Sequence, residues 1–156
     1  MHCVVRLAGG IGQLKFKKFS CMKKPDHSWP KKTIVKTAKP FVDKRGSIHP
    51  LVDVTMRSAL IIHSKKGSVR ANHYHKTDWH YCYVLSGSID YHHRPVGSKA
   101  KPKVVHVKTG ELFFTPPMVE HAMVFPEDGS FLTLSHNQRD QKAYEEDLVR
   151  VELVKP

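Results

Sequence analysis

Short runs of alternating apolar and polar residues, separated by glycine and proline turns, follow one another along most of this chain. The clearest runs are 59–64, 69–75, 81–85, 88–93, 103–107, 111–115, 121–125 and 131–134, with further candidates at 33–36, 41–43, 47–54 and 149–153. Only residues 140–147 have a helical pattern. Many short strands at this spacing predict an all-β sandwich or closed barrel, here with one short C-terminal helix.

Four histidines fall on neighbouring predicted strands. Side chains two residues apart in a strand share a face, so His73 and His75 point the same way, with Ala71 expected on that face too. His80 begins the next strand, and His121 begins a later one. If these faces line one interior, four imidazoles meet at its mouth. Neutral imidazole is a good ligand for divalent transition metals, so the pattern predicts a metal site or a proton-transfer site.

Composition narrows the choice of partner. The chain has 26 basic and 14 acidic residues and a net charge of +12, which favours anionic ligands. The basic residues are scattered and accompany no nucleic-acid-binding motif, so an anionic small molecule fits better than nucleic acid. No apolar run approaches the roughly 20 residues of a membrane span. Three cysteines form no disulfide framework and suit a reducing cytoplasm.

The first residues differ from the rest of the chain. Residues 1–21 contain four basic side chains and no acidic one. We expect this segment to be a basic, disordered extension. Residues 22–156 are expected to form a single domain with one core.

The glycines around the histidines resemble the two motifs of the cupin superfamily, whose fold is a double-stranded β-helix (jelly-roll) barrel. The first motif, G-x5-H-x-H-x4-E-x6-G, is matched by Gly67, His73, His75 and Gly87, with His80 at the glutamate position. The second, G-x5-P-x-G-x2-H-x3-N, is matched by Gly110, Pro116 and His121, with Met118 and Phe125 replacing the glycine and the asparagine. The resemblance implies a metal ligated by residues 73, 75, 80 and 121. Histidine in place of glutamate leaves the metal open among zinc, iron, manganese and nickel.

Two further stretches resemble sugar-nucleotide cupins. Residues 41–46 are similar to the F-x-D-x-R-G opening of dTDP-4-dehydrorhamnose 3,5-epimerases and dTDP-sugar 3,4-ketoisomerases. Residues 70–75 are similar to the R-G-x-H-Y and R-G-x-H-x-H motifs of those enzymes, and closely resemble the cupin domain of capsular-polysaccharide reductases. The resemblance implies that Arg70 holds a phosphate or sugar oxygen. In the metal-free enzymes of this kind His73 would be the catalytic base.

These observations lead to one main expectation and three alternatives. The main one is a cytoplasmic, homodimeric metal-binding cupin that isomerises or epimerises a keto-sugar borne on a nucleotide. Arg70, Lys76 and Arg139 are the candidate contacts for this anionic substrate. The alternatives are a metal-free epimerase or ketoisomerase with His73 as base, an iron-dependent dioxygenase, and a non-catalytic module that binds metal or sugar.

Overall fold

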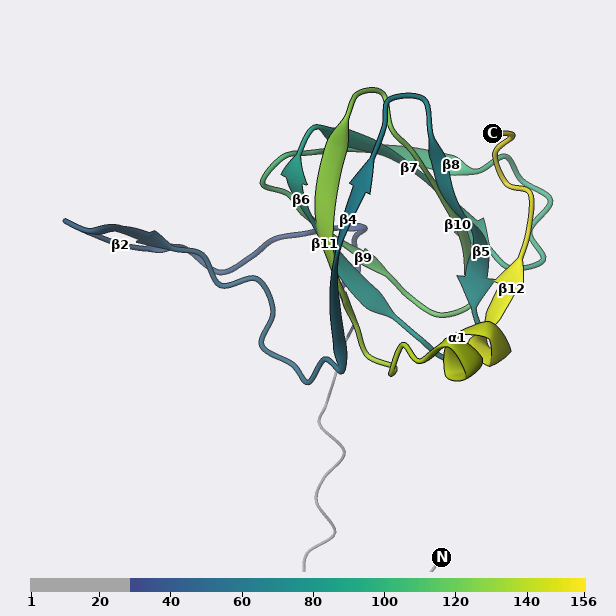
Figure 1. Cartoon of the computed structure of the whole chain (residues 1–156), viewed down its shortest axis with the longest axis horizontal. Coiled ribbons are helices and arrows are strands. Elements are labelled where there is room, and N and C mark those ends of the chain that lie inside the picture. The colour runs from purple at the N-terminus through teal and green to yellow at the C-terminus, as the bar shows by residue number, and fades with distance from the viewer. Residues whose placement is uncertain (1–28) are drawn as a thin grey trace, which may run out of the picture.

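The computed structural model describes residues 29–156, so the extension expected at 1–21 lies outside the described part. Two five-stranded antiparallel sheets face each other and form a barrel (Figure 1). The first sheet has the order β1 (Ile34–Val35), β9 (Leu112–Thr115), β6 (His80–Ser86), β11 (Gly129–Ser135) and β4 (Ser58–Ser64). The second has the order β12 (Leu148–Arg150), β5 (Val69–His75), β10 (Val119–Val124), β7 (Ser88–Pro95) and β8 (Lys103–Lys108). The predicted all-β jelly-roll with one short helix is confirmed.

The main core lies between the two sheets. Strand alternation turns Cys82 and Val84 of β6 inward, where they pack against Phe113 of β9 and Met123 of β10. Burial of such side chains contributes about 1.5–3 kcal/mol each and holds the sheets together. The histidines occupy one end of this core, because they stand at the end of β5 and at the starts of β6 and β10.

A second apolar cluster covers the outer face of the first sheet. Trp79, Tyr81 and Phe114 are buried there beneath Val52 and Val54. This packing explains the apolar alternation of residues 47–54, which had predicted a strand. That prediction is wrong beyond Ile48, where β3 ends two residues before a proline. Proline lacks the N–H that a strand ladder needs, so the segment packs on the sheet without joining it.

A two-stranded hairpin projects from the barrel. It consists of β2 (Phe41–Asp43) and β3 (Gly46–Ile48), joined by a turn at residues 44–45 (Figure 1). Its apolar side chains are exposed, with 59% of Phe41, 70% of Val42 and 66% of Ile48 accessible. An isolated hairpin of this size is marginally stable in water, so these side chains are suited to a partner surface.

Strand β5 contains a bulge at the residues that precede the site. His121 of β10 faces His73, and the next residue, Ala122, faces Ala71, so Asn72 is an extra residue on β5. Ala71 and Asn72 both have positive φ, at 67° and 54°. The bulge reverses the alternation, so Arg70 lies opposite the inward-facing Met123. Ala71, which was expected on the face of His73, lines the same cavity as His73, and Arg70 lines it too, so simple alternation ends at the bulge.

The C-terminal segment closes the histidine end of the barrel. Helix α1 (Gln141–Asp147) begins after Asp140, whose side chain accepts a hydrogen bond from the Ala143 N–H, a standard N-cap. Strand β12 then pairs with β5, with Leu148 opposite His75. This pairing brings the end of α1 beside the histidines. Within residues 29–156, no helix is long and apolar enough to span a bilayer.

Candidate functional site

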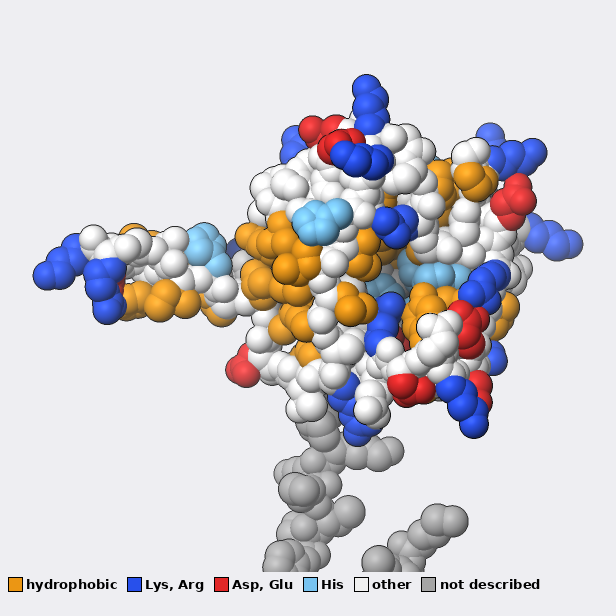
Figure 2. Space-filling model, viewed as in Figure 1, with side chains coloured by type: hydrophobic (Ala, Val, Ile, Leu, Met, Phe, Trp, Pro, Cys, Tyr) orange, Lys and Arg blue, Asp and Glu red, His pale blue; other side chains and the backbone are white. Residues whose placement is uncertain are grey.

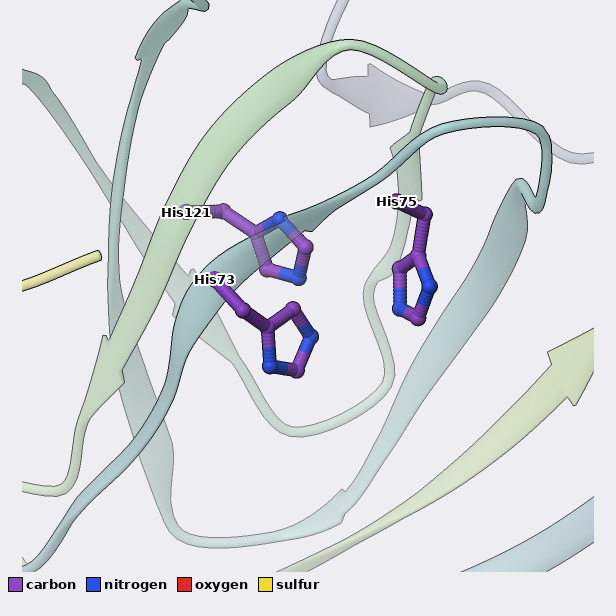
Figure 3. A group of neighbouring side chains, drawn as sticks. All are labelled: His73, His75 and His121. Atoms are coloured by element: carbon purple, nitrogen blue, oxygen red, sulfur yellow. The ribbon is translucent and has the colours of Figure 1, made fainter. Parts of the chain in front are cut away.

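Three of the predicted histidines converge on one point. His73 and His75 come from β5, and His121 comes from β10 (Figure 3). One nitrogen from each of the three lies within 4.8 Å of the others. The ring centroids of His73 and His121 are 4.7 Å apart, and those of His73 and His75 are 4.8 Å apart. Such spacing allows three imidazoles to bind a single ion.

Hydrogen bonds fix the orientation of two of these rings. His75 Nδ1 is 2.9 Å from Oδ2 of Asp147, and His121 Nδ1 is 3.0 Å from the carbonyl oxygen of Val119. Each oxygen accepts a hydrogen bond from the Nδ1–H, so Nε2 carries the lone pair. Both Nε2 atoms are buried with no hydrogen-bond partner among the described residues. This arrangement fits metal binding, in which the second ring nitrogen is held by a carboxylate or a backbone carbonyl.

His80 lies beside this group and forms a second one. Its ring centroid is 5.5 Å from that of His75 and 5.6 Å from that of His121. One potential ligand atom from each of His80, His75 and Asp78 lies within 4.8 Å of the other two. His80 is 3% exposed, and its Nδ1 also lacks a partner among residues 29–156. The four predicted histidines are therefore neighbours, arranged as two triads that share His75.

Burial keeps all four imidazoles neutral. Burial, together with the repulsion from neighbouring histidines, lowers the pKa of His73 to about 2 and that of His121 to about 3. Burial likewise holds the pKa of His80 well below its usual value. It also lowers the pKa of His75, against the opposing effect of the nearby carboxylates. Neutral imidazole is the form that binds metal ions.

A cavity of about 150 Å³ opens onto the histidines. Arg70, which is exposed, lines it together with Arg139 and Tyr144. Figure 2 shows histidine side chains in a recess of the barrel with basic side chains nearby. Arg70 donates from Nε to Ser64 Oγ at 2.6 Å and also lines a larger cavity of about 450 Å³. Two guanidinium groups beside a cluster of neutral imidazoles suit an anionic ligand.

Lys76, the third predicted substrate contact, lies outside the residues that line this cavity. It is exposed, and its Nζ donates to the Glu146 carbonyl oxygen at 2.7 Å.

Three residues of the site were not predicted from the sequence. Asp147 holds His75, Asp78 completes the second triad, and the Tyr144 ring centroid lies 5.8 Å from that of His75. The guanidinium carbon of Arg139 sits 4.9 Å from the Tyr144 ring centroid, a cation–π contact. Asp147 and Tyr144 carry no motif, since only the pairing of β12 with β5 brings them to the histidines. The close spacing of Asp78 to both histidines was visible in the sequence.

A family model of the cupin domain matches residues 60–136. No curated protein matches the sequence. The fold is similar to that of QdtA, a sugar 3,4-ketoisomerase from Thermoanaerobacterium thermosaccharolyticum solved with TDP, at 20% identity and a TM-score of 0.60 over 76% of this chain and 88% of that one.

Two other solved proteins share the fold. The dTDP-4-dehydrorhamnose 3,5-epimerase of Sulfolobus tokodaii is 19% identical, with a TM-score of 0.56 over 69% of this chain and 71% of that one. The capsular polysaccharide assembling protein CapF of Staphylococcus aureus is 21% identical, with a TM-score of 0.56 over 81% of this chain and 33% of that one. At these identities the likeness is one of fold. The family model assigns a cupin domain to residues 60–136 of this chain.

Proposed function

We propose that this cupin binds one divalent metal ion at its histidine cluster and isomerises or epimerises a nucleotide-linked keto-sugar. The observation that carries the proposal is the set of buried, unpartnered nitrogens on His75, His80 and His121. A buried polar atom without a hydrogen bond costs about 1–3 kcal/mol, and three such nitrogens on rings whose centroids lie 5.5–6.0 Å apart suit a cation. The fold neighbours that act on TDP- or dTDP-sugars support the substrate class.

Each part of the site has a role in this proposal. A bound divalent ion would act as a Lewis acid on the sugar carbonyl and so acidify the adjacent C–H. Arg70 and Arg139 line the cavity and would bind the anionic part of the substrate. The 11% exposure of the Asp147 side chain leaves it largely shielded, so it keeps the His75 ring in one orientation. These residues orient the substrate before any proton moves.

The metal-free alternative uses His73 as the base that removes this proton. A general base works best when its pKa is close to the working pH. Burial lowers the pKa of His73 to about 2, which makes the free imidazole a weak base at neutral pH. The carboxylate of Asp147, which would raise the pKa of a histidine base, is hydrogen-bonded to His75. These two observations favour a metal-dependent reaction over direct proton removal by His73.

Metal quantification in untagged protein tests the proposal. We expect about one equivalent of divalent metal in the wild type, and loss of that metal in a His73→Ala, His75→Ala double variant. His49→Ala, which removes an exposed histidine on the loop after β3, is the matched control. Turnover of TDP-linked 4-keto sugars should vanish on chelation and return on metal addition. Metal-free protein with full turnover would establish the metal-free alternative.

A homodimer in the cytoplasm completes the proposal. The exposed apolar side chains of the β2–β3 hairpin support a second copy as partner, since a patch of this kind is uncommon on a monomer. Light scattering on the purified chain would measure twice the monomer mass of 17.8 kDa. A monomer at micromolar concentration would contradict the homodimer and leave the metal proposal in place.

A further inference from the structure

A buried carboxylate lies in the turn between β5 and β6. Asp78 is 3% exposed, and its ligand oxygen lies within 4.8 Å of a nitrogen of His75 and one of His80. A carboxylate held out of water is costly unless it is paired or bound to a metal. The position is notable because the cupin motif has glutamate where this chain has His80.

The contacts of Asp78 leave one of its oxygens available. Oδ1 accepts a hydrogen bond from the Asn137 N–H at 2.8 Å. Oδ2 forms a long ion pair with a guanidinium nitrogen of Arg139, at 3.9 Å, which is beyond hydrogen-bond distance. His75 Nε2 and His80 Nδ1, both buried, lack partners among the described residues. Two buried imidazole nitrogens without a partner, and a carboxylate whose second oxygen forms only this long ion pair, thus lie close together.

We propose that Asp78 is a metal ligand, binding the ion together with His75 and His80. This inference rests on the proposed metal site and specifies its ligands. The carboxylate supplies the negative charge that is lost when histidine stands at position 80. Two imidazoles and one carboxylate are a set that suits Fe²⁺ and Mn²⁺, whereas a site made only of imidazoles has less preference for these oxygen-seeking ions. The local spacing of the three residues, His-x2-Asp-x-His, presents them from one turn.

The Asp78→Asn variant tests the role of Asp78 as a metal ligand while keeping its structural hydrogen bond. The asparagine Oδ1 still accepts the hydrogen bond from the Asn137 N–H, so the turn keeps its support, but the negative charge is lost. We expect Mn²⁺ affinity, measured by titration calorimetry, to fall by more than about 100-fold, which is the upper end for loss of an outer-shell partner. Zn²⁺ affinity should fall less. Asp90→Asn is the control, because Asp90 pairs with His106 on β8, away from the cluster.

X-ray absorption on Mn²⁺-loaded wild type provides a test that does not depend on how a variant folds. Its first shell should contain a carboxylate oxygen and two imidazoles. Wild type that binds metal with imidazole as its only protein ligand, or Asp78→Asn protein with wild-type Mn²⁺ affinity, overturns the inference and leaves the metal proposal standing. Wild type that binds neither Mn²⁺ nor Zn²⁺ overturns the metal proposal itself.

Discussion

Mild acid should destabilise the metal-free protein, because His73, His80 and His121 stay unprotonated while the chain is folded. His73, His80 and His121 have native pKa values far below the ordinary value of about 6.5. In the unfolded chain they return to that value. As the pH falls through 6.5 the unfolded state gains protons that the native state does not, so the free energy of unfolding decreases with falling pH.

The size of the loss follows from the three groups. A histidine with a pKa of about 6.5 when unfolded, and unprotonated when native, loses about 1.3 kcal/mol of stabilisation between pH 7 and pH 5.5. Three such groups lose about 4 kcal/mol. His75 is left out of the sum because nearby carboxylates oppose the effect of its burial. Small domains are stable by about 5–15 kcal/mol, so the loss is a large part of the total.

Urea unfolding followed by circular dichroism, in the presence of a chelator, measures this slope at several values between pH 7 and pH 5.5. Replacing His80 with glutamine should reduce the loss by about one third, since one of the three groups is gone. His49→Gln, on the exposed loop after β3, should keep the wild-type slope. A free energy of unfolding that stays constant over this range would refute the reasoning, as would equal effects of the two substitutions.

Three further substitutions each test one contact of the fold or the site. Gly87 has φ of +72° and a Cβ there would lie 2.6 Å from a backbone oxygen, so Gly87→Ala should lower the Tm more than Gly97→Ala, where φ is +80° and the space is open; equal losses would contradict the steric argument. Asp147→Asn should weaken metal binding about 10- to 100-fold, measured by calorimetry, because it weakens the support of His75; unchanged affinity would remove Asp147 from that role. Arg139→Gln should weaken TDP binding, most at low salt, in a fluorescence titration; a loss independent of salt would argue against charge recognition.

The strand pattern and the histidines could be predicted because both depend on local sequence. Alternation in a strand places His80, Cys82 and Val84 on one face, and the structure buries all three. The strand proposed at 69–75 matches β5 residue for residue. A period-two pattern shows which face of a strand is buried, and that pattern lies entirely within the strand's own sequence.

Other features depend on pairing between distant segments. The bulge at Asn72 arises where β5 meets β10, and Arg70 beyond it lines the cavity against the simple alternation. Asp147 reaches His75 only because β12 pairs with β5, more than seventy positions along the chain. Neither contact has a sequence signature, because register between strands is set by the whole sheet. The strand predicted at 47–54 is wrong beyond Ile48 for a related reason, since the apolar residues that follow pack on a sheet without joining it.

The free-energy cost of burying these histidines indicates that they bind a ligand and do not mainly stabilise the fold. Aliphatic side chains at the positions of His80 and His121 would extend the core formed by Cys82 and Met123, with no polar atoms to satisfy. Instead, His75, His80 and His121 each bury an unpartnered nitrogen, at about 1–3 kcal/mol per atom. The three together cost about 3–9 kcal/mol, which is comparable to the whole stability of a small domain. An ion bound to these nitrogens offsets that cost and stabilises the native state by mass action. The melting temperature should therefore rise with metal concentration in the wild type, and much less in a variant with apolar residues at both positions.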